Sequence, residues 1–484
     1  MRILVRRDVG LPVKNEILLD KGHPFLDQTD EPCQTISTRP VDIAIDKEGG
    51  KMPAKQSTDK PIYKVPSMAE IEALPPNGFN VISTFSGAGG SCLGYRMAGF
   101  RVLWANEFIP AARDTYKLNH PDSILDARDI RTVTGAEILE ATSLKKGELD
   151  LFDGSPPCAS FSTAGKREAG WGKVKQYSDS AQRTDDLFFE YSRLLTELQP
   201  KVFVAENVSG LVKGSAKGYF IEILKALKAA GYNVKACLLD AQWLGVPQKR
   251  QRIIFIGVRN DIGLDPVHPK PFPYRYSVRE ALPWIDTVLN FPGGDYYDKK
   301  GERVPLSEGE PMPTIQASQQ RVPLVSDLPK RVVAIEGANG FNGHAYAPAD
   351  EPAATIQANR TLNVIESETD ISKFSIGEEW SKLRPGETSD KYLNLSRASA
   401  DGACPTVTAM GGISSIAGVT HPFEKRKFSI AELKRICAFP DDFELTGTYT
   451  QQWERLGRSV PPVMMSHIAK TIEREILCKI KNKI

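Results

Sequence analysis

The sequence predicts a Rossmann-like α/β domain with a mostly parallel sheet, joined to a smaller, irregular and β-rich domain. From Phe79 to about residue 275, apolar strand-like segments alternate with helical patterns, which is typical of a parallel sheet covered on both faces. From about residue 276 to 422 the chain is rich in Pro, Gly, Ser and Thr and has few helical runs. Helical patterns return after residue 423 and continue to the end of the chain.

Each element is predicted from its own pattern. Strands, as apolar runs that end in polar or glycine-rich turns, are expected at 79–85, 101–107, 149–152, 201–207, 233–240 and 252–258. Helices are expected directly after the SGAGG turn, at 186–199, at 218–231, near 429–433 and from Pro461 to about residue 480. A serine N-cap with a glutamate three residues on begins the helix at Ser429, and two prolines begin the last helix.

Composition excludes several classes of protein. The chain has 484 residues, of which 41% are hydrophobic and 25% charged, as in a globular protein of two or three domains. Its seven cysteines form no CxxC pair and its six histidines are dispersed, so we expect no disulfide framework and no metal site. No segment approaches the ~18 apolar residues of a membrane span, and the cysteine usage favours a reducing cytoplasm. A net charge of +2 neither supports nor excludes a nucleic-acid partner.

The irregular region contains a near-repeat. Residues 310–318, 351–359 and 403–412 each carry a Pro, then a Thr, then a β-branched residue, and residues 30–38 carry a fourth version. These segments are interpreted as similar short strands that build one recognition surface, to which the N-terminal arm adds a strand. The alternative is that Pro-x-x-Thr-Ile is a common entry into a strand and recurs by chance.

A single cysteine follows two prolines after the predicted strand 149–152. Pro156 and Pro157 stiffen the turn that follows Asp153-Gly154 and place Cys158 at its tip. Cysteines of a hydrophobic core usually lie inside periodic apolar runs, and this one does not. The pattern favours a nucleophilic cysteine.

A glycine-rich turn and two carboxylates follow other strands. SGAGG (86–90) offers backbone N–H groups at the start of a helix, which suits an adenosyl cofactor. Glu107 ends the second strand, where an acidic residue typically binds a ribose diol, and Asp129 ends the next strand-like segment, where it could meet an adenine amino group. For either residue alone, a solvated carboxylate would be the better interpretation. Their shared place at the carboxyl ends of strands favours a ligand site.

With these residues in this order, the chain resembles the DNA cytosine-5 methyltransferases. The matching segments are FSGAGG (85–90), Glu107, Asp129-Ile130, GSPPCxxFS (154–162), DDLF (185–188), AENV (205–208), QKRQR (248–252), residues 425–443 and GRSVPP (457–462). The resemblance covers about 79–260 and 423–484, and the family has a variable target-recognition domain where this chain becomes irregular. It implies a catalytic cofactor-binding domain (79–275), a target-recognition domain (276–422) and a helical segment (423–484) that completes the catalytic domain. Before them, residues 1–78 are interpreted as an irregular N-terminal arm and linker, because Pro, Gly and Asp break their strand-like segments.

The resemblance also implies roles for individual residues. Cys158 would attack C6 of a cytosine flipped out of double-stranded DNA, Glu206 would donate a proton toward N3, and Arg250 and Arg252 would orient Glu206 and hold the base and the nearby phosphate. The implied donor is S-adenosylmethionine, without a metal. The residues expected to hold the donor are Phe85, Ser86, Gly87, Gly89, Glu107, Phe108, Asp129, Ile130, Pro157, Leu187, Arg458 and Ser459.

Several alternatives stay open at this point. Glu206-Asn207 could cap a strand, and Gln248 to Arg252 could form a solvated basic turn. The alternative functions are a tRNA cytosine-5 methyltransferase and a DNA-binding protein that has lost catalysis. We expect a monomer in the cytoplasm of a prokaryotic or phage-infected cell, and a setting such as restriction-modification. The sequence gives no target site.

Two positions depart from the family's pattern. Arg458 stands where the family usually has Asn beside the donor, and Ser83-Thr84 stand where it often has Asp-Leu. A cation beside a sulfonium is unfavourable unless an anion lies between them. Arg458 is therefore expected either to point outward or to pair with a carboxylate on the transferred group. The second case implies carboxy-S-adenosylmethionine as donor and carboxymethyl transfer. Ser83-Thr84 is interpreted as ordinary variation.

Overall fold

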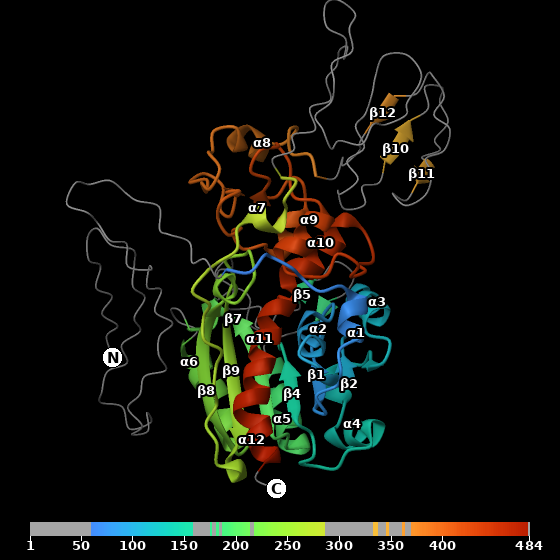
Figure 1. Ribbon diagram of the computed structural model, residues 1–484, viewed down its shortest axis with the longest axis vertical. Helices are drawn as coiled ribbons and strands as arrows, with labels where there is room; N and C mark the ends of the chain where they lie inside the picture. Colours follow the sequence, from blue (N-terminus) through green and yellow to red (C-terminus); the bar gives the residue numbers. More distant parts are fainter. Residues whose placement is uncertain are drawn as a thin grey trace, which may run out of the picture.

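The computed structural model describes residues 60–157, 175–176, 181–182, 186–212, 217–285, 333–336, 345–347, 361–363 and 369–482 (Figure 1). Within this part, a seven-stranded sheet has the order β3-β2-β1-β4-β7-β9-β8. Its strands are β1 (Asn80–Thr84), β2 (Arg101–Asn106), β3 (Ile124–Asp126), β4 (Leu151–Gly154), β7 (Val202–Val208), β8 (Tyr232–Asp240) and β9 (Gln251–Arg259). β9 runs antiparallel to both of its neighbours, and the other pairs are parallel. The predicted fold class is confirmed.

Helices cover both faces of the sheet because its strands alternate between two apolar sets. Val81, Leu151 and Val204 belong to the core under α2 (Gly90–Arg96), α3 (Pro110–Asn119) and α11 (Pro462–Ile472). Ile82, Phe152 and Phe203 belong to the opposite core, under α4 (Gly135–Thr142), α5 (Leu187–Leu198) and α6 (Lys217–Ala229). Such two-sided burial is expected for a parallel sheet, and it produces the apolar runs seen in the sequence.

The C-terminal helix lies directly on the helix that follows the glycine-rich turn. Figure 1 shows α11 along one face of the sheet. A Cβ on Gly94 of α2 would lie 2.5 Å from Cβ of Met465, and a Cβ on Gly90 would lie 2.5 Å from the carbonyl oxygen of Val460. Only residues without a side chain permit this approach. The contact holds the chain just before α11 beside the glycine-rich turn. A π turn (Glu473–Leu477) and α12 (Cys478–Lys481) continue α11.

The N-terminal part of the described chain packs against the C-terminal segment. The hydroxyl of Tyr63 donates to the carbonyl of Arg435 (2.6 Å), and the backbone N–H of Met68 donates to the carboxylate of Asp442 (3.0 Å). Helix α1 (Met68–Glu72) begins with a capping box and buries Ile71. Residues 60–78 therefore differ from the irregular arm that the sequence predicts, because they carry a helix and belong to the packed body.

The region expected to recognise the target is joined to the C-terminal segment by a shared core. Residues from both of its ends, such as Leu282 and Val407, pack with Leu433, Phe439 and other residues of the C-terminal segment. Figure 1 shows α7 to α10 beyond the carboxyl edge of the sheet. The elements are α7 (Val278–Ala281), α8 (Ser375–Trp380), β13 (Ser396–Arg397), β14 (Val419–Thr420), α9 (Ile430–Ile436) and α10 (Tyr449–Arg458). Ile371, Ile376, Trp380, Leu383 and Leu395 form a small core of their own.

Short strands complete the described elements. A three-stranded antiparallel sheet has the order β11-β10-β12, and β5 pairs with β6. Their bounds are β5 (Lys175–Gln176), β6 (Ala181–Gln182), β10 (Val333–Glu336), β11 (Ala345–Ala347) and β12 (Thr361–Asn363). In the part of the chain that the structure describes, no helix is long and apolar enough to cross a membrane.

The near-repeat has a different outcome at each copy. The copies at 310–318, 351–359 and 30–38 lie outside the described residues. The copy at 403–412 lies beside the strand entry at residues 247–250, where Cys404 bridges Gln248, and it ends in a 3-10 turn (Ala409–Gly412). Its last glycines lie against Trp453 of α10. This copy packs on the catalytic domain, so its repeat-like sequence alone does not place it on a recognition surface.

Candidate active site

The glycine-rich turn connects β1 to α2 through an unusual backbone conformation. Phe85 has a φ of 54°, and Gly87 and Gly89 have φ values of 57° and 89°. A bulky residue in the left-handed region is uncommon and often marks a functional site. The N–H of Ser86 donates to the carbonyl of Asn106 (3.0 Å), which fixes the turn against β2. A Cβ on Gly87 would meet nothing within 4 Å, so this side of the turn has room for a ligand.

Glu107 is held beside the turn by two backbone donors. The N–H of Gly87 donates to Oε2 and the N–H of Ile109 donates to Oε1, both at 2.7 Å. Burial raises the pKa of Glu107, while the two N–H donors and the charges of Arg455 and Arg113 oppose the rise. The alternative of a solvated carboxylate does not fit a side chain so enclosed. Its place at the carboxyl end of β2 is the one expected for a ribose-binding acid.

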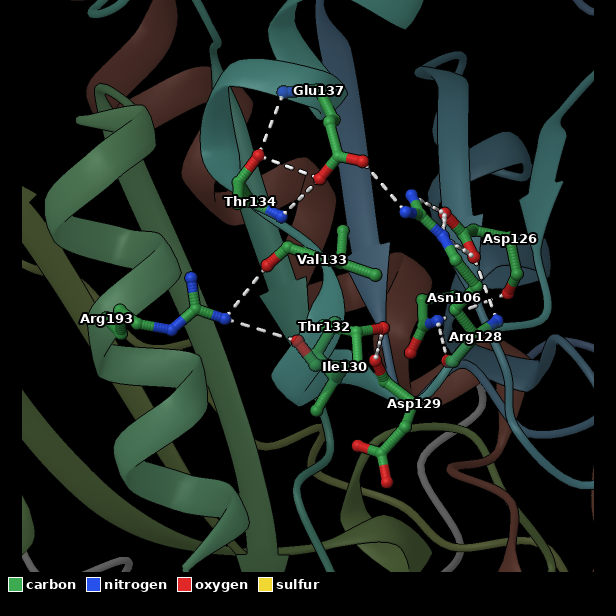
Figure 2. Close-up of polar contacts among 10 residues, drawn as sticks. All are labelled: Asn106, Asp126, Arg128, Asp129, Ile130, Thr132, Val133, Thr134, Glu137 and Arg193. Atoms are coloured by element: carbon green, nitrogen blue, oxygen red, sulfur yellow. Dashed lines mark hydrogen bonds and ion pairs between the residues drawn. The ribbon is translucent and has the colours of Figure 1, made fainter.

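Asp129 occupies the next strand's end but has another set of partners. Its side chain accepts from the N–H of Arg131 (3.1 Å), and its carboxylate pairs with the Arg131 guanidinium at 2.9 Å. Figure 2 shows its carboxylate pointing away from the pair formed by Asp126 and Arg128. Arg193 of α5 donates to the carbonyls of Ile130 and Val133, which anchors the turn that carries Asp129 (Figure 2).

The remaining residues expected to hold the donor differ in how far they are buried. Ile130 and Leu187 are buried, and Phe108 and Pro157 are half-buried. Ser459 lies against the start of α2, because its Cβ would lie 3.2 Å from a Cβ on Gly90. Arg458 has 43% of its side chain exposed and its Nε lies 2.8 Å from Glu454. The outward-pointing alternative for Arg458 therefore fits the structure, and the carboxylate that it faces belongs to the protein.

Glu206 and Arg252 form a buried ion pair on neighbouring strands. Nε of Arg252 lies 2.7 Å from Oε1 of Glu206, with 12% and 10% of the two side chains exposed. Glu206 lies within β7 and Arg252 within β9, so neither the strand cap nor the solvated turn describes them. Burial lowers the pKa of Arg252, and the charge of Glu206 opposes that change. An arginine so placed fixes the carboxyl by a charge-assisted hydrogen bond.

Arg250 lies directly before β9 and has other partners than Arg252. Its Nη1 donates to the carbonyl of Val407 (3.2 Å) and its Nη2 to the carbonyl of Gly457 (2.9 Å). Burial and the charge of Arg252 lower its pKa to about 9. Arg252 thus contacts Glu206, whereas the hydrogen bonds of Arg250 join the region expected to recognise the target to α10. The sequence spacing could not separate these roles, because both partners of Arg250 are carbonyls of distant segments.

The chain that leads to the cysteine is held from both neighbouring strands. The amide of Asn207 donates to the carbonyl of Pro156 (3.1 Å), and the N–H of Ser155 donates to the carbonyl of Thr84 (3.4 Å). Cys158 is the next residue after Pro157 and lies outside the described residues. The AENV segment thus supplies Glu206 together with an asparagine that fixes the turn. The sequence showed the segment but not this second contact.

Asp153 is a buried carboxyl that sequence reasoning missed as a site residue. It is the third residue of β4, and it accepts hydrogen bonds from Ser83 and Tyr95. Its signal in the sequence is a charged residue inside an apolar strand, directly before the Pro-Pro-Cys turn. No group of three or more His, Cys, Asp or Glu side chains that could hold a metal occurs among the described residues.

Comparisons with known proteins agree with this geometry. The model of the C-5 cytosine-specific DNA methylase family matches residues 79–474. Type II methyltransferase M.Sau96I of Staphylococcus aureus is 27% identical over 454 residues, which cover 94% of this chain and 89% of that protein. Type II methyltransferase M.AgeI of Thalassovita gelatinovora is 26% identical, and the match covers 81% of this chain and 98% of the relative.

A solved structure supports the fold. A protein described as a DNA modification methyltransferase encoded within an E. coli prophage superposes with a TM-score of 0.53 and 23% identity. The superposition covers 83% of this chain and 100% of that protein. The family model spans far more than half of this chain and includes the glycine-rich turn, the Glu206–Arg252 pair and the segment before α11. The chain belongs to the C-5 cytosine-specific DNA methylase family.

Proposed function

We propose that this DNA (cytosine-5-)-methyltransferase acts on a cytosine flipped out of double-stranded DNA, with Cys158 as its nucleophile. The observation that carries the proposal is the buried Glu206–Arg252 pair, one strand away from the turn that leads into Cys158. Asn207, the neighbour of Glu206, donates to Pro156, so one strand positions both the proton donor and the cysteine's turn. Flipping the base costs a few kcal/mol, which contacts with the protein must offset.

The chemistry follows from the weak nucleophilicity of cytosine C5. The thiolate of Cys158 forms a bond to C6, and Glu206 delivers a proton toward N3, so that the ring becomes an enamine with a nucleophilic C5. After C5 has taken the methyl group, its proton leaves to water. The electrons of the C5–H bond then re-form the C5=C6 double bond and expel the Cys158 thiolate, and the proton on N3 returns to Glu206. Arg252 keeps the Glu206 carboxyl oriented throughout.

The described residues fit an adenosyl cofactor. S-adenosylmethionine, the donor that the family implies, supplies an electrophilic methyl group on a sulfonium. The turn at 86–89 offers an open flank at Gly87, and Glu107 presents a fixed carboxylate at the carboxyl end of β2. Ser459 approaches the start of α2 from the C-terminal segment. Phe85, Phe108, Asp129, Ile130, Pro157 and Leu187 complete the proposed set.

Methyl transfer is favoured over carboxymethyl transfer by the contacts of Arg458. The carboxymethyl alternative needed a guanidinium enclosed in the donor pocket and lacking an anion. Arg458 instead is exposed over 43% of its side chain and lies 2.8 Å from Glu454. We therefore take S-adenosylmethionine as the donor.

The biological setting is proposed from the relatives. The proteins from S. aureus and T. gelatinovora are type II methyltransferases, which suggests a restriction-modification setting for this chain. Residues 276–422 would read the target sequence in the DNA grooves. We propose a monomer, since one chain supplies the proton donor, the strand that leads into the cysteine's turn and the glycine-rich turn.

Replacement of the nucleophile tests the proposal. Cys158→Ser should abolish turnover and keep DNA binding, because a hydroxyl is far less nucleophilic than a thiolate at neutral pH. A duplex with 5-fluorocytosine at the target should give a covalent adduct with the unmodified enzyme, because fluorine cannot leave as a proton does. Cys404→Ser is the matched control. Cys404 is fully buried and has no proposed part in the reaction, so this variant should still form the adduct. Turnover by Cys158→Ser near the wild-type rate would disprove the assignment.

A further inference from the structure

A buried carboxyl stands at the end of the strand that leads into the catalytic turn. Asp153 is 1% exposed. Its Oδ2 accepts from the hydroxyl of Ser83 (2.9 Å) and its Oδ1 accepts from the hydroxyl of Tyr95 (3.0 Å). The carboxylate thus takes two donors from two different elements, β1 and α2, which flank the glycine-rich turn on either side.

The contact with Ser83 joins two functional segments. Ser83 and Asp153 are register partners on the parallel strands β1 and β4. Ser86 of the glycine-rich turn donates from its hydroxyl to the carbonyl of Ser83 (3.2 Å). One residue beyond Asp153, Gly154 ends β4, and the chain then continues into Pro156 and Pro157. A change at Asp153 therefore reaches both the cofactor turn and the turn before Cys158.

We propose that Asp153 is a positioning residue for methyl transfer, because its carboxylate holds β1 and α2 against the strand that leads into Cys158. The proposal rests on the proposed function, since it concerns the geometry of that reaction. Asp153 touches neither base nor donor in this account. It acts by fixing the ends of β1 and β4 relative to each other and to α2.

The surroundings of Asp153 make its charge sensitive to pH. The titratable groups that act on it or respond to it are Cys92 and Tyr95 of α2, Tyr191 of α5 and Glu206 of β7. Burial raises the pKa of Asp153 to about 7; the Ser83 and Tyr95 hydroxyls oppose the rise and the charge of Glu206 adds to it. The two hydroxyl donors fit the ionised carboxylate of Asp153, because each of its oxygens carries no proton and can accept one hydrogen bond.

Asp153→Asn separates a positioning role from a purely structural one. Asparagine keeps the shape but has an NH2 donor in place of one carboxylate oxygen, so one of the two hydroxyls no longer meets an acceptor. At pH 8, kcat should fall by roughly ten- to a hundredfold, as small misplacements of reacting groups cause. Near pH 6, where the wild-type carboxyl is mostly protonated, the two enzymes should become similar. The ratio of their kcat values is the quantity to measure, because ionisations common to both enzymes cancel in it.

The stability of Asp153→Asn should not fall together with its kcat. A carboxyl whose pKa is raised in the folded state holds its proton to higher pH there than in the unfolded chain. Stability therefore falls as pH rises from the unfolded pKa to the folded value of about 7. Asp153→Asn has no charge to bury, so above pH 7 it should unfold at the same or higher urea concentration while turning over more slowly. A merely structural residue would lose stability and activity together.

Two further variants complete the experiment: a double variant that moves the carboxylate from residue 153 to residue 83, and a matched control. Asp153→Ser alone should lose roughly tenfold or more in kcat, and Ser83→Asp combined with Asp153→Ser should recover most of it, because the carboxylate stays between the same strands. Asp150→Asn is the control at the other end of β4. Asp150 is buried and pairs with Lys201 at 2.7 Å, so this change should lower stability and give a kcat ratio that does not vary with pH.

The outcomes are distinct. A pH-independent kcat ratio for Asp153→Asn, or a transposed variant no more active than Asp153→Ser, would overturn the role of Asp153. Full activity of Cys158→Ser would overturn the proposed nucleophile instead, and it would leave the measurements on Asp153 readable, since they compare variants of the same reaction.

Discussion

Arg250 and Arg252 show how two arginines at the start of one strand acquire different tasks, since Arg250 lies directly before β9 and Arg252 within it. Both guanidiniums lie in the interior, where the charge of Glu206 acts on each of them. Nε of Arg252 lies 2.7 Å from Oε1 of Glu206, while Arg250 donates to the carbonyls of Val407 and Gly457. We expect Arg250 to support the site by fixing chain segments, and Arg252 to act on the proton donor directly.

Arg458→Asn tests the choice of donor at the same scale. The substitution removes an ion pair between a partly exposed guanidinium and the buried carboxylate of Glu454, which keeps Arg455 as a second partner at 3.0 Å. We expect methylation with nearly unchanged kcat and 5-methylcytosine as the product of both enzymes. Mass spectrometry of the DNA after incubation with S-adenosylmethionine and carboxy-S-adenosylmethionine in competition measures this. Appearance of 5-carboxymethylcytosine from the unmodified enzyme, and its loss in Arg458→Asn, would restore the carboxymethyl alternative.

At the scale of elements, the contact of α2 with α11 organises the cofactor side. Gly90 and Gly94 let the C-terminal helix approach so closely that Ser459 reaches the glycine-rich turn. The strand periodicity and the glycine turn could be predicted from the sequence because both are local patterns. The partners of Arg250 and the Ser83–Asp153 pair could not, because residues 70 or more positions apart meet only through the sheet order and the packing of α10.

Gly94→Ala tests this helix contact. The new methyl group would lie 2.5 Å from Cβ of Met465 and 2.6 Å from the carbonyl oxygen of Pro462. We expect a loss of about 1–3 kcal/mol in the free energy of unfolding and weaker binding of S-adenosylmethionine, because the helices must separate. Gly218→Ala is the matched control in α6, where a Cβ meets nothing within 4 Å, and it should stabilise by about 0.5–1 kcal/mol. Urea unfolding and titration calorimetry measure both effects, and equal behaviour of the two variants would contradict the role given to α11.

At the scale of the whole molecule, the region expected to recognise the target and the expected catalytic domain are not independent blocks. The ends of the expected domain 276–422 share a core with α9 and α10, and the segment at 403–412 runs beside residues 247–250. The length and composition of residues 276–422 predicted a unit separate from the catalytic domain. The shared core could not be predicted, because its contributors are isolated apolar residues without a period.

An exchange of segments tests where sequence specificity lies. Residues 286–368, replaced by the corresponding segment of a relative with another target, should move the modified sequence and leave kcat within about tenfold, since the described core residues that join this region to the catalytic domain lie on either side of the segment. Exchange of all of 276–422 should in addition lower stability. Bisulfite sequencing of modified DNA reports the target. Specificity that stays with the recipient would refute the assignment of the recognition region.

The placement of α11 has a consequence for biosynthesis. The face of the sheet that α11 covers is complete in the nascent chain once β9 has emerged, but about 200 residues still separate β9 from α11, or roughly 10–40 s of translation. During that interval the apolar face of the sheet is not yet covered by α11, and the glycine-rich turn lacks its contact with Ser459. The enzyme therefore gains its donor site only when synthesis is nearly finished, and a prematurely terminated chain would be inert toward DNA and prone to aggregation.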